Sequence, residues 1–347
     1  MNITADQKTM LALAYCADLN LTGGDSKAAP DEVYRGILGG LQVMNGKIGA
    51  HWKLCWGPVI YSFSPPSVPS GREIDNLMFV AQDGTNPHYA VAIAGTDYKS
   101  LWDWILEDLL VKETKAWPCR NPPSPAPRVS LSTFIGLDIL RHASPKGTTP
   151  LGQPFPGTGQ TLLQFLASVP QDEPITVSTT GHSLGGALAP TLALYLKDEL
   201  AQWNRSGNAT VSPYAFAGPT PGDGAFAAYF QTQFPNGMSR IWNGLDIVPH
   251  AWDVPQLQEI PTLYGTPAVP KVANTVADLV KSVQKDDYAP LNDAPPAFSG
   301  PQQWGTPTTE DAFFKEAIYQ HTLAYWIWGG IHDWHWPKPP KPRIPTG

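Results

Sequence analysis

The segment that most constrains the fold of this chain is 174–196, which reads PITVSTTGHSLGGALAPTLALYL. Its first part is rich in β-branched residues, which favour a strand, and its last part is rich in Ala and Leu, which favour a helix. Between them lies Gly-His-Ser-Leu-Gly, with Ser183 at its centre. A sharp strand-to-helix turn of this kind projects the serine hydroxyl at the positive end of the helix. The alternative is a glycine-rich turn in which Ser183 serves only as an N-cap.

The rest of the chain predicts helices and strands on both sides of this turn. Thr4 and Asp31 are predicted to be helix N-caps. The segment GTNP at 84–87 is predicted to join two strands as a hairpin. Pro190 is predicted to kink the helix that follows Ser183. From about residue 90 onward strands and helices alternate, which favours an α/β fold with a mostly parallel central sheet and helices on both faces. The predicted helices are 4–18, 31–44, 133–143, 161–169, 184–203 and 224–234, and the predicted strands are 52–63, 76–83, 88–96, 174–181, 211–218 and 238–244.

The segment 251–305 interrupts this alternation. It is rich in proline and contains one helical island, at 271–284. Because it holds too few apolar clusters to fold alone, we expect an insertion within a single domain that spans 1–347.

Composition excludes several classes of function. Charged residues are 15% of the 347 and the net charge is -7, without the basic clusters of a nucleic-acid-binding protein. No apolar run reaches the length of a membrane span, about 18 residues. The first twenty residues lack the pattern of a signal peptide, so the expected location is the cytoplasm by default, with secretion by another route left open.

Cofactor chemistry has equally little support in the sequence. There is no glycine-rich phosphate loop and no ligand cluster, so we expect no cofactor and no metal, with calcium bound by scattered aspartates left open. Three cysteines without zinc spacing do not form a disulfide framework. One bridge among Cys16, Cys55 and Cys119 stays open.

A reactive serine needs a base to take its proton and an acid to orient that base. In folds with this turn the acid and the histidine follow the serine in that order. Asp246, in RIWNGLDIVPH, lies just beyond a predicted strand and is the candidate acid; a turn-capping role is its alternative, and Asp253 is its competitor. His321, in KEAIYQHTLAYW, is the candidate base because the apolar residues after it would anchor it against the core. A histidine that only packs within a helix is the alternative for His321. The competing histidines are His250, His332 and His335.

Acyl transfer also requires donors for a developing oxyanion. The backbone N–H of Leu184, directly after the serine, is one candidate, and Thr96, at the end of the predicted strand AVAIAGT, is the other. Plain turn chemistry is the alternative for Thr96. The next segment, DYKSLWDWILEDLLVKE, predicts an amphipathic helix that is either a surface helix or a lid over an apolar acyl site. The candidate lid and substrate-binding residues are Leu101, Trp102, Trp104, Ile105 and Leu109.

These motifs together resemble the class 3 (fungal-type) lipase family. TGHSLGGALA resembles the family's nucleophile motif, and AIAGTD followed by LWDWILEDL resembles its oxyanion strand and lid. YAFAGPTPGDGAFAAYF resembles the strand and loop that come after the helix of the nucleophile motif. RIWNGLDIVPH and HTLAYW resemble the segments that carry the catalytic aspartate and histidine. The resemblance covers roughly 75–328, in family order. At Ala94, before the oxyanion Gly-Thr, the family usually has arginine.

The resemblance implies an α/β-hydrolase that cleaves carboxylic esters through an acyl-serine. It implies Ser183 as nucleophile, His321 as general base and then acid, and Asp246 as the residue that orients it. It likewise implies an oxyanion hole made by Thr96 and Leu184.

The sequence therefore leaves three functions open. The first is a triacylglycerol lipase whose lid makes transient contact with a lipid surface. The second is an esterase for soluble or aromatic esters, and the third is a hydrolase-fold binding protein without turnover. A complete serine, aspartate and histidine set disfavours the third, and the apolar lid candidate disfavours a peptidase.

Overall fold

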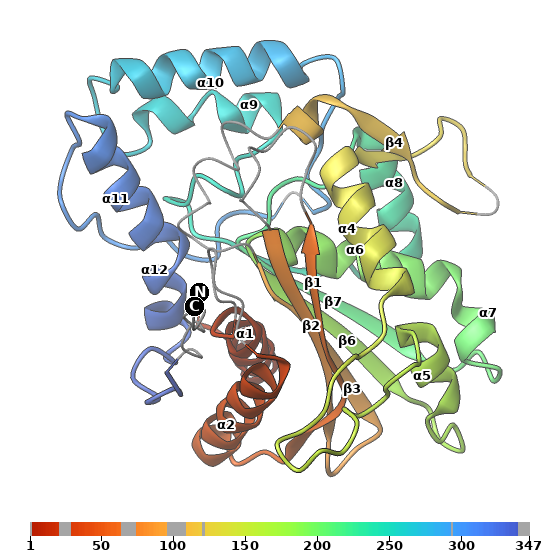
Figure 1. Ribbon diagram of the computed structural model, residues 1–347. Helices are drawn as coiled ribbons and strands as arrows, with labels where there is room; N and C mark the ends of the chain where they lie inside the picture. Colours follow the sequence, from red (N-terminus) through yellow and green to blue (C-terminus); the bar gives the residue numbers. More distant parts are fainter. Residues whose placement is uncertain are drawn as a thin grey trace, which may run out of the picture.

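The structure is a computed structural model, which describes residues 2–20, 29–63, 74–95, 109–119, 122–292 and 294–338. Its centre is a six-stranded sheet with the order β1-β2-β3-β6-β7-β8 (Figure 1). The first three strands are antiparallel, with the predicted hairpin between β2 and β3, and β3, β6, β7 and β8 run parallel. The predicted α/β fold is thus confirmed. The strands are β1 Trp52–Phe63, β2 Ile74–Asp83, β3 His88–Ile93, β6 Thr176–His182, β7 Thr210–Phe216 and β8 Ser239–Ile241.

Helices cover both faces of this sheet, because alternate strand residues point to opposite sides. In β2, Leu77, Phe79 and Ala81 belong to the core under α1 and α2, whereas Met78 and Val80 belong to the core on the other face. Figure 1 shows α1 and α2 on one side and α4, α5, α6 and α8 on the other. The helices are α1 Ala5–Asp18, α2 Pro30–Ile48, α4 Leu131–His142, α5 Leu162–Ser168, α6 Leu184–Asp198, α7 Leu200–Trp203 and α8 Gly224–Gln233.

The two predicted N-caps have different outcomes. Thr4 caps α1 as predicted, and its side chain accepts the N–H of Gln7 in a capping box. The prediction for Asp31 is wrong, since α2 begins at Pro30 and Ala29 is its N-cap. Proline is favoured at the first helical position, because its φ is already helical and it has no N–H to leave unpaired. Asp31 lies instead in the first turn, where its charge suits the helix dipole.

The segment 251–305 joins the rest of the molecule through a third apolar core. Its buried residues, among them Tyr264 and Val276, pack with Phe313 and with Val111. Figure 1 shows α9 and α10 beside α11, away from the sheet. The elements of this region are α9 Val254–Leu257, η3 Ile260–Thr262, α10 Pro270–Val283, α11 Glu310–His321 and α12 Leu323–Trp328. A short sheet of β4 Thr114–Ala116 and β5 Arg128–Ser130 follows η2 Leu109–Lys112.

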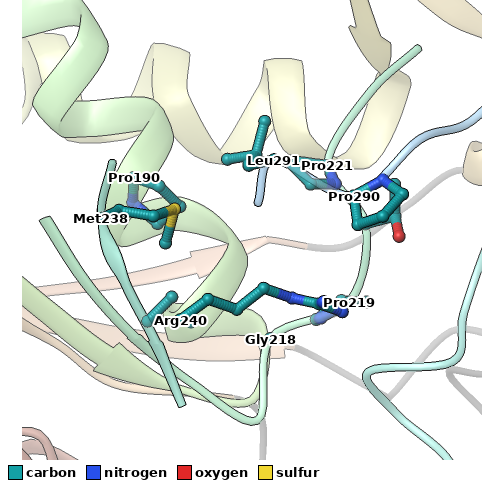
Figure 2. A pocket seen from close by; sticks show the side chains of 11 residues that line it. Pro190, Gly218, Pro219, Pro221, Met238, Arg240, Pro290 and Leu291 are labelled. Atoms are coloured by element: carbon teal, nitrogen blue, oxygen red, sulfur yellow. The ribbon is translucent and has the colours of Figure 1, made fainter. Parts of the chain in front are cut away.

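The helix α6 continues through Pro190. A proline lacks the N–H that would bond the carbonyl four residues earlier, here that of Gly186. Both residues line a cavity of about 20 Å³, which is enough for a single water molecule. Figure 2 shows Pro190 together with Met238, Arg240 and Leu291 around this space. The cavity is too small for an acyl chain, so we exclude it as a substrate site.

No helix within the described ranges combines the length and the apolar character needed to cross a membrane.

Candidate active site

The predicted strand-to-helix turn is present at Ser183. The strand β6 ends at His182, the helix α6 begins at Leu184, and Ser183 between them has φ 60° and ψ −126°. A non-glycine residue adopts such a conformation only where its surroundings impose it, and strained residues of this kind concentrate at active sites. The surroundings here are the sheet itself, because the Ser183 N–H donates to the Phe216 carbonyl of β7 at 3.0 Å.

The flanking glycines are required by close backbone contacts. A Cβ at Gly181 would collide with the backbone of Gly185. A Cβ at Gly185 would collide with the carbonyl of Ile93 and would lie 3.0 Å from the carbonyl carbon of Ala94, both at the end of β3. The sequence motif therefore reflects the tight packing of one helix start against two strand ends.

His321 lies within hydrogen-bond distance of both Ser183 and Asp246. The Nε2 of His321 lies 2.8 Å from Ser183 Oγ, and its Nδ1 lies 3.0 and 2.9 Å from the two oxygens of Asp246. Asp246 follows β8, and His321 is the last residue of α11. Since a carboxylate only accepts, Nδ1 carries the proton, and Nε2 is free to accept the serine O–H.

The environment of His321 favours its neutral form. All three residues are buried, with exposed fractions of 3% for Ser183, 1% for His321 and 0% for Asp246. Burial lowers the pKa of His321 below the ordinary histidine value, although the charge and hydrogen bond of Asp246 act in the opposite direction. A neutral imidazole is the form that accepts a proton, so the resting site is prepared to activate the serine.

Asp246 is held by donors other than the histidine. The Val248 N–H donates to its Oδ1 at 3.0 Å, and the Tyr325 hydroxyl donates to its Oδ2 at 2.8 Å. Tyr325 in turn accepts the Asn243 N–H at 2.9 Å. Burial and the charge of Asp246 raise the pKa of Tyr325, so it stays a donor. The sequence analysis missed Tyr325; the available signal was a hydroxyl one helical turn after His321, within an apolar run.

A second acid lies behind the serine. The Asp18 carboxylate, at the end of α1, lies 3.3 Å from His182 Nδ1 and accepts the Gly95 N–H at 2.7 Å. Burial by itself lowers the pKa of His182, but the hydrogen bond and the charge of Asp18 outweigh it, so the net pKa lies above the ordinary value. Asp18 was also missed. Its signal was an acid at a helix C-terminus, where the helix dipole disfavours negative charge.

The competing candidates lie elsewhere in the structure. Asp253 caps α9, where it accepts the Gln256 N–H at 3.2 Å. His250 is buried with its Nδ1 at 3.2 Å from the Gln256 carbonyl. His332 and His335 are exposed in the segment after α12. None of these side chains takes part in the contacts described above for Ser183.

The remaining predicted site residues have partial or no description. Leu184 begins α6, so its N–H belongs to the first turn, whose amides have no partner within the helix. Leu109 begins η2, and its side chain is outside the described part. The other oxyanion and lid candidates lie outside the described residues; they are Thr96, Leu101, Trp102, Trp104 and Ile105.

This arrangement contains the parts that nucleophilic acyl transfer requires. A strained turn presents a serine hydroxyl, a neutral imidazole accepts its proton, and a buried carboxylate stabilises the imidazolium that results. The N-terminus of α6, which carries the partial positive charge of the helix dipole, lies directly after Ser183.

The chain is similar to known lipases in part of its sequence and in its fold. A family model described as "Lipase (class 3)" matches residues 153–255. The crystal structure of M37 lipase superposes with a TM-score of 0.80 at 29% sequence identity, over 95% of each chain. A lipase from Rhizopus microsporus var. chinensis gives a TM-score of 0.44 at 16% identity, over 72% of this chain and 71% of the other. Among curated protein sequences no significant relative was found.

Proposed function

We propose that the chain is a member of the class 3 lipase family and a serine lipase that hydrolyses the ester bonds of triacylglycerols. One observation carries the proposal, namely that Ser183, His321 and Asp246 form a continuous hydrogen-bonded line. Stability of the fold does not require a serine, a histidine and an aspartate from three distant parts of the chain to meet in this order. Acyl transfer explains the order, because each group acts on the next.

The proposed reaction begins with Ser183. Its Oγ attacks the ester carbonyl as His321 Nε2 takes the hydroxyl proton, and Asp246 stabilises the imidazolium formed. The proton then passes to the leaving alcohol, which leaves an acyl-enzyme. Water repeats the sequence and releases the fatty acid. The N–H of Leu184 is the proposed first donor to the oxyanion, and Thr96 is the proposed second donor.

The proposal extends to contact with lipid surfaces. Ser183 and His321 are almost fully buried, so an ester reaches them only after part of the chain moves. The apolar segment that contains Trp102 and Trp104 begins shortly after Gly95 in the sequence. We assign this segment as the lid, which would open when its apolar residues enter a lipid surface.

A series of acyl chain lengths tests the proposal. Hydrolysis of triacylglycerols is measured below and above their solubility limit, beside Ser183→Ala. We expect the rate to rise sharply once an emulsion forms, long chains to be preferred, and Ser183→Ala to lose activity by a factor on the order of 10⁶. A rate that saturates smoothly through the solubility limit, with preference for acetyl or aromatic esters, would assign an esterase instead. Failure of a fluorophosphonate to label Ser183 would assign a binding protein.

A further inference from the structure

Asp18 connects three parts of the active-site region that are distant in sequence. Its Oδ1 accepts the Gly95 N–H at 2.7 Å, where β3 has just ended. Its Oδ2 lies 3.3 Å from His182 Nδ1, at the end of β6. On the other side of that ring, Nε2 lies 2.7 Å from the backbone carbonyl of His321. The Asp18 carboxylate therefore contacts Gly95, which precedes Thr96, and His182, which precedes Ser183. Through the His182 ring it is also connected to the backbone of His321.

The chemistry of these contacts determines the protonation of His182. A backbone carbonyl only accepts, so Nε2 must donate to it, and the carboxylate that faces Nδ1 also only accepts. A neutral ring would present a lone pair to one of the two. The two acceptors therefore favour the imidazolium form of His182, with Asp18 as its counter-ion. The groups that face this ring are Asp18, Asp246, the His321 carbonyl, the His321 ring at 4.7 Å between centroids, and the Tyr325 ring. The two acids favour the charged form of His182, whereas the charge of His182 lowers the pKa of His321.

The hydrogen bond of Gly95 is important because Gly95 packs closely against the nucleophile. A Cβ at Gly95 would lie 2.7 Å from the His182 carbonyl oxygen and 2.9 Å from Ser183 Cβ. The backbone at Gly95 is therefore in close contact with the nucleophile, and Thr96 is the next residue. The preceding residue, Ala94, is buried and has no polar side chain with which to hold this strand end. Asp18 supplies the acceptor.

We propose that Asp18 is a positioning residue for the ester hydrolysis, which fixes the strand end before the oxyanion donor and, through the His182 imidazolium, the backbone of His321. This inference rests on the proposed function. Asp18 touches neither the reacting atoms nor the serine. Its removal allows the oxyanion donors and the imidazole to drift from the reactive geometry, and a misplacement of about 1 Å can lower a rate by about 10².

A purely stabilising role is the competing explanation. Buried ion pairs contribute little net stability, since the cost of removing two charges from water offsets their attraction. The side chain of His182 is 6% exposed and that of Asp18 is 17% exposed. A position maintained only for stability would be filled as well by apolar side chains. The two explanations differ in what happens to turnover at each correctly folded active site.

The test compares Asp18→Asn and Asp18→Ala with Asp6→Asn, a matched change on an exposed residue of the same helix. Asparagine retains an acceptor for the Gly95 N–H without the charge, and alanine retains neither. Active sites are counted with a fluorophosphonate, and kcat is expressed per labelled site on a soluble ester. We expect kcat to fall about tenfold in Asp18→Asn and about 10²-fold in Asp18→Ala, with KM unchanged, and to stay at the wild-type value in Asp6→Asn.

The nitrogen shifts of His182 provide a second, independent readout. In ¹⁵N-histidine-labelled protein at pH 7, wild type and Ser183→Ala should both show His182 with two protonated nitrogens, and Asp18→Ala should show a neutral ring. Wild-type kcat per site in both Asp18 variants, or a neutral His182 in wild type, would overturn the inference. Full activity in Ser183→Ala would instead overturn the proposed function, so the two failures are distinguishable.

Discussion

The hydroxyl of Tyr325 donates a hydrogen bond of 2.8 Å to Asp246 Oδ2, the same oxygen that lies 2.9 Å from His321 Nδ1. Both partners are fully buried. The carboxylate that orients the histidine is therefore itself oriented by a side chain one helical turn beyond that histidine. Because the Asn243 N–H donates to the same hydroxyl, the chain after β8 and the chain after α11 are tied together at one atom.

Tyr325→Phe should lower kcat by about tenfold, since one hydrogen bond to a charged group contributes about 1.5–3 kcal/mol. It should also lower the free energy of unfolding by about 1–3 kcal/mol, because the buried Asn243 N–H loses its acceptor. Initial rates on a soluble ester and urea unfolding measure the two effects. Tyr319→Phe, on the partly exposed part of α11, serves as the control for the same chemical change. An unchanged kcat beside a lowered stability would reduce Tyr325 to a structural role.

Asp246→Asn should reduce kcat by a factor on the order of 10⁴, because an amide cannot stabilise the imidazolium and favours the wrong tautomer. Stopped assays at saturating ester measure the loss. Asp253→Asn is the matched control, since Asp253 caps α9 and asparagine is an equally good N-cap. The control should retain wild-type kcat. A larger loss in Asp253→Asn than in Asp246→Asn would mean that the acid has been assigned to the wrong residue.

The acid limb of the pH–rate profile should lie below pH 6.5. The pKa of His321 is lowered by burial, and the base must be neutral to act. As pH falls, kcat/KM therefore stays constant through 6.5 and decreases only when the lowered pKa is passed. Since the folded pKa is below the unfolded one, the stability contributed by neutral His321 is likewise present above 6.5 and lost as pH falls through the folded pKa. A limb centred above pH 7 would contradict the neutral resting form.

The parts of the site that sequence could predict depend on local patterns. The turn at Ser183 is encoded by neighbouring glycines, and Asp246 is recognised by its place just after a strand. His321 could be ranked above three other histidines because an apolar run follows it. Each of these signals lies within about ten residues of the functional atom, where periodicity and turn chemistry are informative.

The parts that could not be predicted depend on contacts between distant segments. Asp18 meets Gly95 across 77 positions, and His182 meets the His321 carbonyl across 139. No local pattern specifies that α1 ends beside β3 and β6. The N-cap at Ala29 was missed for a smaller reason, since a proline at the first helical position places the N-cap of α2 two residues before Asp31.

Gly185→Ala should lower both stability and turnover. The new Cβ would collide with the Ile93 carbonyl, and the backbone atoms there have no room to move, so we expect a loss of about 1–3 kcal/mol of unfolding free energy. The start of α6 would shift relative to β3, which displaces the Leu184 N–H, and kcat should fall about 10²-fold. Gly46→Ala is the control, because Gly46 lies within α2 and a Cβ there meets nothing within 4 Å. It should instead gain about 0.5–1 kcal/mol, since alanine is the better helix former. Urea unfolding and initial rates on one soluble ester check both variants. Equal effects of Gly185→Ala and Gly46→Ala would contradict the predicted collision, because they would show that the start of α6 has room for a Cβ.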